Sequence, residues 1–140
     1  PEVDVPLSMI GAFKESYSYV GDNESGVRVK VPVDGKPRKV EIGKQVGESC
    51  NALLAEIFES LKTVISKASP QSVFSMLQNI ILTGGGSRIR GIDQELQRML
   101  VDDGYENPEV SISSKDVIPF VAIGALKVAK AAREDQWIKL

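Results

Sequence analysis

The sequence contains no histidine and a single cysteine, Cys50. Without histidine, this chain lacks Ser–His and Cys–His nucleophilic chemistry and the commonest metal ligand. One cysteine allows neither an intramolecular disulfide nor a thiolate metal site. The formal net charge is −2, from 17 basic and 19 acidic residues, so there is no basic surplus to favour nucleic acid. We therefore expect no nucleic-acid partner.

Long apolar runs are also absent from the sequence. No segment approaches the length of a membrane span, and no signal peptide is visible. The 140 residues are 42% hydrophobic and 26% charged, which is typical of a globular domain. We expect a cytoplasmic protein without a transmembrane segment. Because the first residue is Pro1 rather than methionine, we also expect a piece of a longer protein or a processed product.

The chain is organised around residues 80–91, which read IILTGGGSRIRG. This pattern predicts a short buried strand, a glycine-rich turn and the start of an amphipathic helix. Three consecutive glycines weaken regular structure, so the turn needs a positive φ or a close approach of its backbone to another group. Backbone amides beside a helix N-terminus suit an anion or the sugar–phosphate side of a nucleotide. The alternative is a tight connection that binds nothing.

Apolar periodicity predicts the other elements. Residues 6–19 have a helical stripe, and residues 27–33 and 38–42 predict a β-hairpin around Asp34-Gly35. The cations of the hairpin fit a solvated face better than a binding patch.

A long stripe then predicts a helix over about residues 45–68, with Cys50 buried in the stripe and Phe58 off its centre. We expect next a short helix over residues 69–77 and a buried strand over residues 79–83. An amphipathic helix that ends by residue 103, a strand over residues 108–112 and an alanine-rich helix over residues 116–132 should follow. Gly124 in the last helix suggests close approach by another element or a ligand. Trp137 and Ile138 are expected to dock on the protein. This mixture is α/β or α+β, with too few strands for a self-sufficient sheet.

The strand, the glycines Gly84–Gly86 and the Arg-x-Arg-Gly of residues 88–91 resemble the adenosine motif of the actin-like ATPases. That superfamily includes actin, MreB and the heat-shock chaperone ATPases. Three more features stand in the order that the family requires: Lys14-Glu15 with Tyr17 and Tyr19-Val20, the hairpin and long helix with Asn51-Ala52-Leu53, and residues 121–126 with 136–138. The resemblance covers essentially the whole chain, which would represent only the C-terminal part of such a protein.

The resemblance implies an α/β fold, the C-terminal part of an actin-like (ribonuclease H-like) ATPase with a small lobe containing the β-hairpin and a large αβ lobe. Residues 1–46 would end the small nucleotide-side lobe. Residues 47–118 would form most of the second large lobe, with the adenosine motif. Residues 119–140 would be the returning C-terminal helix and tail of the first lobe.

The resemblance also implies a set of nucleotide-contacting residues: Lys14, Glu15, Gly84, Gly85, Gly86, Ser87 and Arg88. The glycines would let the backbone pass close to adenine and ribose. Ser87 would continue that wall and is able to cap the next helix. Arg88 aligns with the arginine that stacks on adenine in the chaperones, or is a solvent-exposed first-turn arginine.

Lys14 and Glu15 would hydrogen-bond the ribose and the adenine edge, or form an ordinary exposed pair. Gly11 stands where actin has another adenine-contacting side chain, so that contact is absent or supplied elsewhere.

The family's two phosphate loops and the residue that positions the attacking water would lie upstream of residue 1. We therefore expect no catalytic residue here and no ATP hydrolysis by this chain alone. The implied function is a portion of a bacterial actin-like cytoskeletal protein that binds ATP or ADP with Mg²⁺ in an interdomain cleft and polymerises into filaments. Residues 13–21 and 77–91 most resemble the bacterial actins that organise magnetosomes, with cargo-linking proteins as partners.

Other interpretations remain open. One is a truncated, non-catalytic actin-like module that binds or decorates filaments. A second is an MreB-like cell-shape protein, and a third is another branch, such as a sugar kinase or a chaperone ATPase. The last is a structural fold that is independent of nucleotide.

Overall fold

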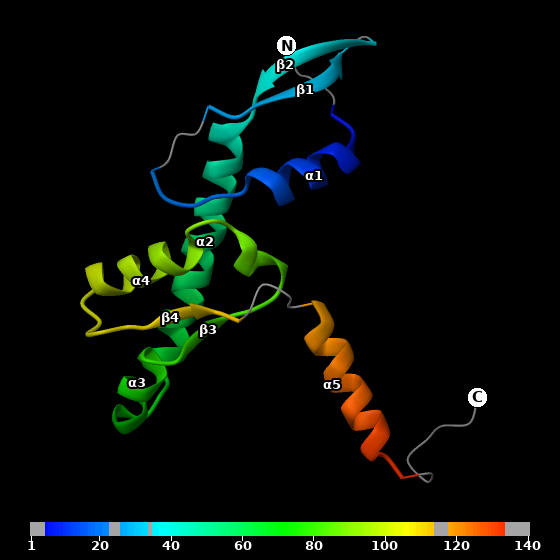
Figure 1. Ribbon diagram of the computed structural model, residues 1–140. Coiled ribbons are helices and arrows are strands. Elements are labelled where there is room, and N and C mark those ends of the chain that lie inside the picture. Colours follow the sequence, from blue (N-terminus) through cyan, green and yellow to red (C-terminus); the bar gives the residue numbers. More distant parts are fainter. Residues whose placement is uncertain (1–4, 23–25, 34, 114–117, 134–140) are drawn as a thin grey trace.

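One long helix, α2 (Gly43–Ser66), lies between two groups of helices and strands that pack along its length (Figure 1). The computed structural model describes residues 5–22, 26–33, 35–113 and 118–133. Helix α1 (Leu7–Tyr17) and a β-hairpin lie at the N-terminal end of α2. A second group of helices and strands lies towards its C-terminal end. Helix α2 is therefore the common support of both groups.

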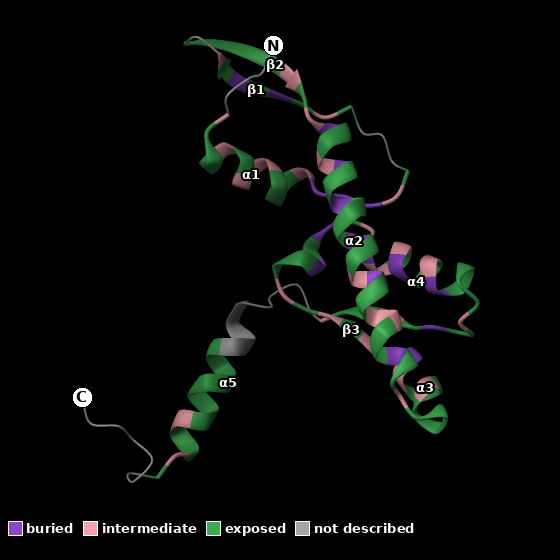
Figure 2. Cartoon of the chain, turned by 180° about the vertical axis from the view of Figure 1, so that it is seen from behind, coloured by how far each residue is buried: buried purple, intermediate pink, exposed green. Residues whose placement is uncertain are grey.

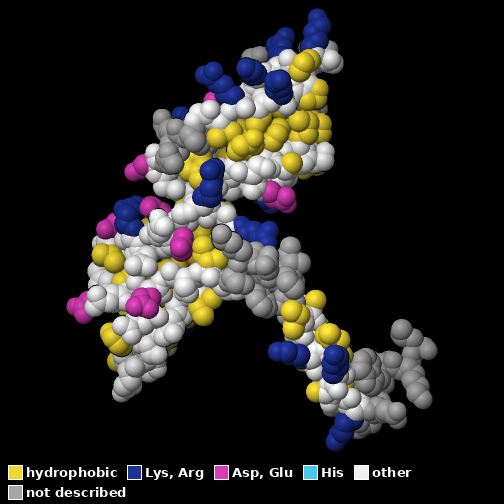
Figure 3. All heavy atoms as spheres, in the orientation of Figure 1, with side chains coloured by type: hydrophobic (Ala, Val, Ile, Leu, Met, Phe, Trp, Pro, Cys, Tyr) yellow, Lys and Arg dark blue, Asp and Glu magenta, His cyan; other side chains and the backbone are white. Residues whose placement is uncertain are grey.

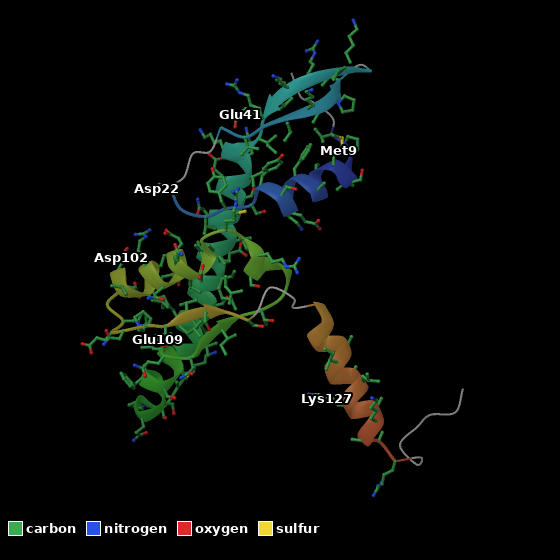
Figure 4. All side chains as sticks on the ribbon, viewed as in Figure 1. Met9, Asp22, Glu41, Asp102, Glu109 and Lys127 are labelled. Atoms are coloured by element: carbon green, nitrogen blue, oxygen red, sulfur yellow. The ribbon has the colours of Figure 1, made fainter. Side chains whose placement is uncertain are left out.

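The hairpin consists of β1 (Arg28–Val33) and β2 (Lys36–Glu41), paired antiparallel with Val29 opposite Val40. Val29 and Val31 are buried between exposed neighbours, as the alternating pattern predicts. At its base, the carboxylate of Glu41 accepts a hydrogen bond from the backbone N–H of Gly43 at 3.1 Å (Figure 4). The hairpin therefore joins directly onto the first turn of α2.

The second group contains a parallel pair of strands. After α3 (Pro70–Leu77), strand β3 (Ile80–Leu82) pairs with β4 (Val110–Ile112), with Ile80 opposite Val110. Parallel strands need a crossover connection, and α4 (Ile92–Asp102) supplies it. The predicted order of elements is confirmed, with bounds that differ by a few residues.

The core lies where α2, α4 and the β3–β4 sheet meet. Leu54, Leu96 and Leu100 expose at most 1% of their surface. Figure 2 shows buried residues along α2 and on α4. Phe58 belongs to this core, so its expected place off the centre of the stripe is wrong. Cys50, Leu54 and Phe58 are spaced four residues apart, and such residues share one face of a helix.

The strand expected to be buried and the apolar stripe of the first helix are both partly exposed in this chain. In β3, Ile81 is 62% exposed, because α2 and α4 cover the sheet from the other face. In α1, the stripe begins with Leu7 at 87% and Ile10 at 49% exposure. Among the described residues, no element covers these two surfaces.

Helix α5 (Ile118–Ala131) extends away from the rest of the chain in both ribbon views (Figures 1 and 2). Ile123, Leu126 and Val128 are between 43% and 72% exposed. A Cβ built on Gly124 would meet no described atom within 4 Å, so the expected close approach is not found there. Trp137 and Ile138 lie outside the described residues. None of the helices in the described ranges is both long and apolar enough to cross a bilayer.

Ion pairs hold the surface of α4. Arg98 contacts Glu95 at 2.5 Å and Asp102 at 2.6 Å, which lowers the pKa of Glu95 and raises the pKa of Arg98. Lys62 on α2 contacts Asp103 at 3.1 Å, just beyond the end of α4, and this hydrogen bond raises the pKa of Lys62. The last pair links the two helices across the edge of the core.

The buried position of Leu96 predicts a large stability loss on truncation. Leu96→Ala should destabilise the full-length gene product by about 2–5 kcal/mol, because the cavity lies between α2 and α4. Leu53→Ala, at a position that is 43% exposed, should change stability by less than about 1 kcal/mol. Denaturant unfolding of both variants checks this, and equal losses would contradict the assigned core.

We expect the Glu95–Arg98 pair to make a pH-dependent contribution to the free energy of unfolding. Because folding lowers the pKa of Glu95, the pair stabilises the fold above the ordinary carboxyl pKa, and this contribution is lost as the pH falls through the lowered value. Arg98→Gln should raise the pKa of Glu95, because the hydrogen bond that lowers it is lost, and NMR titration measures this change. Lys44→Gln, which removes the exposed Lys44–Glu48 pair at 3.9 Å, should leave it unchanged.

Candidate functional site

The glycine turn has a backbone conformation that only glycine adopts easily. Gly84 has φ 85° and ψ −178°, a region that is essentially closed to other residues. Residues Gly85–Arg88 then form a short 3₁₀ turn, η1. The N–H and the hydroxyl of Ser87 both donate to the carbonyl oxygen of Gly84, at 3.2 and 2.8 Å. These two bonds close the turn on itself.

Neither backbone angles nor crowding within the described chain requires glycine at the other two positions. Gly85 and Gly86 are exposed, and neither has a positive φ. A Cβ built on either would meet no described atom within 4 Å, and the same holds for Gly84. The turn therefore presents a stretch of bare backbone to which a flat ligand has unhindered access.

Ser87 does not cap the following helix, so that expectation is wrong. Its side chain is 4% exposed and bonds backward to Gly84. Helix α4 begins five residues later and is preceded by Gly91, which has the left-handed φ of 79°. Gly85 and Gly86 lie in the 3₁₀ turn itself, and residues 89–91 separate this turn from the N-terminus of α4. Arg88 is exposed at the end of this turn.

Lys14 and Glu15 lie in the last turn of α1, and both are exposed. The N–H of Ser18 donates to the carbonyl oxygen of Lys14 at 3.1 Å and ends the helix, and the Ser18 hydroxyl bonds the same oxygen. The chain then straightens, and Tyr19 forms a parallel bridge with Arg90. The end of α1 is thus fixed to Arg90, which lies two residues after the 3₁₀ turn.

The bridge brings together segments that are 70 residues apart in sequence. The N–H of Val20 donates to the Arg90 carbonyl at 3.1 Å, and the N–H of Arg90 donates to the Ser18 carbonyl at 3.3 Å. The Arg90 guanidinium adds bonds of 3.4 Å to the carbonyls of Tyr17 and Ser18. The bridge therefore joins the segment that follows Lys14 and Glu15 to the segment that follows Gly84–Arg88. The sequence indicated Arg90 only as part of the Arg-x-Arg-Gly motif and did not predict its pairing with residues 17–20.

Other surface features lie away from this site. Figure 3 shows Lys and Arg over the hairpin and Asp and Glu around α4. A shallow hollow on α4, lined by Gln94, Gln97, Arg98 and Val101, includes none of the seven residues. Within the described ranges, no group of three or more His, Cys, Asp or Glu side chains is arranged to hold a metal ion.

Known proteins are similar to this chain in sequence and in fold. A family model described as MreB/Mbl protein matches residues 11–136. Actin-like protein MamK of Paramagnetospirillum magneticum is 31% identical over 140 residues, covering 100% of this chain and 40% of that protein. The cell shape-determining protein Mbl of Bacillus subtilis is 30% identical over 79 residues, 55% of this chain and 24% of its own length.

Solved structures agree with the sequence matches. A MamK double helical filament superposes with a TM-score of 0.82 and 29% identity, over 95% of this chain and 40% of that one. A non-polymerising MamK mutant bound to AMPPNP gives a TM-score of 0.79 and 31% identity, over 93% and 39%.

The chain spans about 40% of the length of the MamK proteins that it matches. The superpositions confirm the expected α/β fold as part of an actin-like protein. Since the family model covers most of the sequence, the chain belongs to the MreB/Mbl family of actin-like proteins.

Proposed function

We propose that this chain is the C-terminal portion of a MamK-like filament protein and forms the adenosine side of its nucleotide site. The observation that carries the proposal is the bare backbone of Gly85 and Gly86, which neither conformation nor crowding explains in the described chain. A backbone without Cβ atoms allows close approach of a flat base and its ribose. A similar solved protein holds AMPPNP, an adenine nucleotide analogue.

The side chains around the wall fit an adenosine. Lys14 and Glu15 supply a donor and an acceptor for the ribose hydroxyls and the adenine edge, at the end of a helix that the Tyr19–Arg90 bridge fixes to the turn. Arg88 supplies a planar cation suited to the face of a base. Gly84, Gly86 and Ser87 complete the wall, with Ser87 holding the turn closed.

Magnesium and the phosphate-transfer groups belong, in this proposal, to the part of the protein outside this chain. Mg²⁺ supplies charge neutralisation at the phosphates when it is bound. The residues of this chain bind and orient the nucleoside only. The chain alone should therefore bind nucleotide weakly and hydrolyse none.

The assembled protein would polymerise with itself in the cytoplasm. A relative of 29% identity forms a double helical filament, which supports self-association. The name MamK of these relatives supports a magnetosome role. Cargo-linking proteins are the further partners of this proposal. The chain would divide into residues 1–46 of the small lobe, 47–118 of the large lobe and 119–140 returning to the first lobe.

Gly85→Arg tests the nucleotide wall directly. The position has no positive φ and open space around it, so arginine should fold normally while occupying the volume proposed for adenosine. In the full-length gene product, calorimetry should show AMPPNP affinity falling at least about tenfold. Gln71→Arg adds the same charge on the exposed face of α3 and should bind as the wild type does. Equal affinity of both variants would reject this wall.

Filament formation gives a second test. The full-length product should pellet in the presence of ATP and Mg²⁺ and show filaments by electron microscopy, because assembly is proposed to follow nucleotide binding. The Gly85→Arg variant should stay in the supernatant and Gln71→Arg should pellet. A wild-type protein that binds nucleotide but never assembles would reject the filament function and leave the nucleotide site standing.

A further inference from the structure

The first two turns of α2 carry a face without side chains, against which Tyr19 packs. Gly43 and Gly47 are four residues apart, lie on one side of the helix and are both buried. Tyr19 is 7% exposed, and its hydroxyl donates to the carbonyl oxygen of Gly43 at 3.2 Å. A Cβ built on Gly47 would lie 2.5 Å from the Tyr19 hydroxyl oxygen and 2.7 Å from Cζ. Only glycine at position 47 accommodates this ring.

Glycine inside a helix costs roughly 1 kcal/mol relative to alanine, so Gly47 needs a reason. Its φ is not positive, and it is not at a helix end. The described structure offers one reason, which is the aromatic ring of Tyr19. The contact thus explains a residue that local structure disfavours.

The same face of α2 holds the chain after Tyr19. Asn51, a further four residues along, accepts a hydrogen bond from the N–H of Gly21 at 3.0 Å, and its amide lies 3.5 Å from the Gly21 carbonyl. Gly43, Gly47 and Asn51 therefore form one row on α2. This row fixes residues 19–21 at both ends.

Residues 18–20 are the segment that pairs with Arg90. The pairing comprises the Val20-to-Arg90 bond of 3.1 Å and the Arg90-to-Ser18 bond of 3.3 Å. Ser18 in turn ends α1 at Lys14. Any sideways movement of Tyr19 shifts the end of α1 relative to the glycine turn, because one short segment connects both.

We infer that Tyr19, seated on the Gly43–Gly47 face of α2, is a positioning residue that sets the register between the two halves of the nucleotide site. This inference rests on the proposed nucleotide function. Tyr19 has no proposed contact with the nucleotide or with the glycines at 84–86. It acts through Ser18 and Arg90, by holding Lys14 and Glu15 at a fixed place opposite Gly84–Arg88.

The test uses the full-length gene product with two opposite substitutions in α2. Gly47→Ala improves helix propensity but drives a Cβ into the tyrosine ring. Ala55→Gly, at an exposed position of the same helix, lowers helix propensity and adds no atom that could clash. Gly47→Ala should weaken AMPPNP binding about tenfold or more, and Ala55→Gly should bind as the wild type does. A purely structural role would instead make affinity follow thermal stability.

A second readout needs no ligand. Hydrogen exchange at the Val20 and Arg90 amides should accelerate in Gly47→Ala, since these are the bonds of the bridge. Ala55→Gly should leave both amides protected. Unchanged protection in Gly47→Ala would overturn the inference.

Two substitutions at Tyr19 cover the case in which Gly47→Ala folds poorly. Tyr19→Phe removes only the 3.2 Å hydrogen bond to Gly43 and should weaken binding by a few-fold with an intact fold. Tyr19→Leu shortens the side chain, so Tyr19→Leu with Gly47→Ala should bind nucleotide better than the product of the two single effects predicts. Independent effects would overturn the inference.

The outcomes separate this inference from the function on which it rests. If the wild-type full-length product binds no AMPPNP, the proposed function fails and the positioning role falls with it. If the wild type binds and a folded Gly47→Ala variant binds equally well, the positioning role alone is rejected.

Discussion

The structure depends on the packing face of α2, because two separate parts of the chain are built on it. Toward its N-terminal end, Gly43, Gly47 and Asn51 hold the segment that follows α1. Further along, Leu54 and Phe58 pack against α4 in the core. Helix α2 contains no proline, so we expect at most a gentle curve between these points. The end of α1 and the start of α4 therefore have a fixed relation before any ligand is considered, and the Tyr19–Arg90 bridge lies where the two meet.

The sequence predicted the elements well because their causes are local. Alternation in the hairpin and the long apolar stripe of α2 depend on neighbouring residues alone, and the structure confirms both. Burial was predicted less well, because it depends on what covers each element. Ile81 and Leu7 belong to convincing apolar patterns and are nevertheless 62% and 87% exposed in the described chain. An apolar pattern shows that a face is suited to burial, and the covering layer has to come from elsewhere.

The candidate site shows the same division between local and distant causes. Three glycines look equivalent in the sequence, yet only Gly84 is required by its own backbone angles. Gly85 and Gly86 have open space and no positive φ, so neither crowding nor backbone angles in the described residues account for them. Ser87 was expected to be able to cap the next helix, but its hydroxyl donates to the carbonyl oxygen of Gly84. Gly91 is the residue that precedes the helix. The contact of Tyr19 with Gly47 joins positions 28 residues apart, and periodicity does not reach that far.

The exposed apolar surfaces and the bare glycine wall have one feature in common, which is that no described residue covers either of them. Helix α5, the outer face of β3 and the stripe of α1 all present large apolar side chains to solvent in a chain that spans about 40% of its MamK relatives. Residues on such surfaces stabilise a protein only when another surface covers them. The glycine wall contacts a nucleoside from one side only. A nucleoside bound in this way remains largely hydrated, so the wall alone stabilises it little. Under the proposed function, nucleotide binding and closure of the remaining protein over this chain would bury adjoining surfaces. Each would then favour the other, because a ligand stabilises whichever arrangement it contacts more fully.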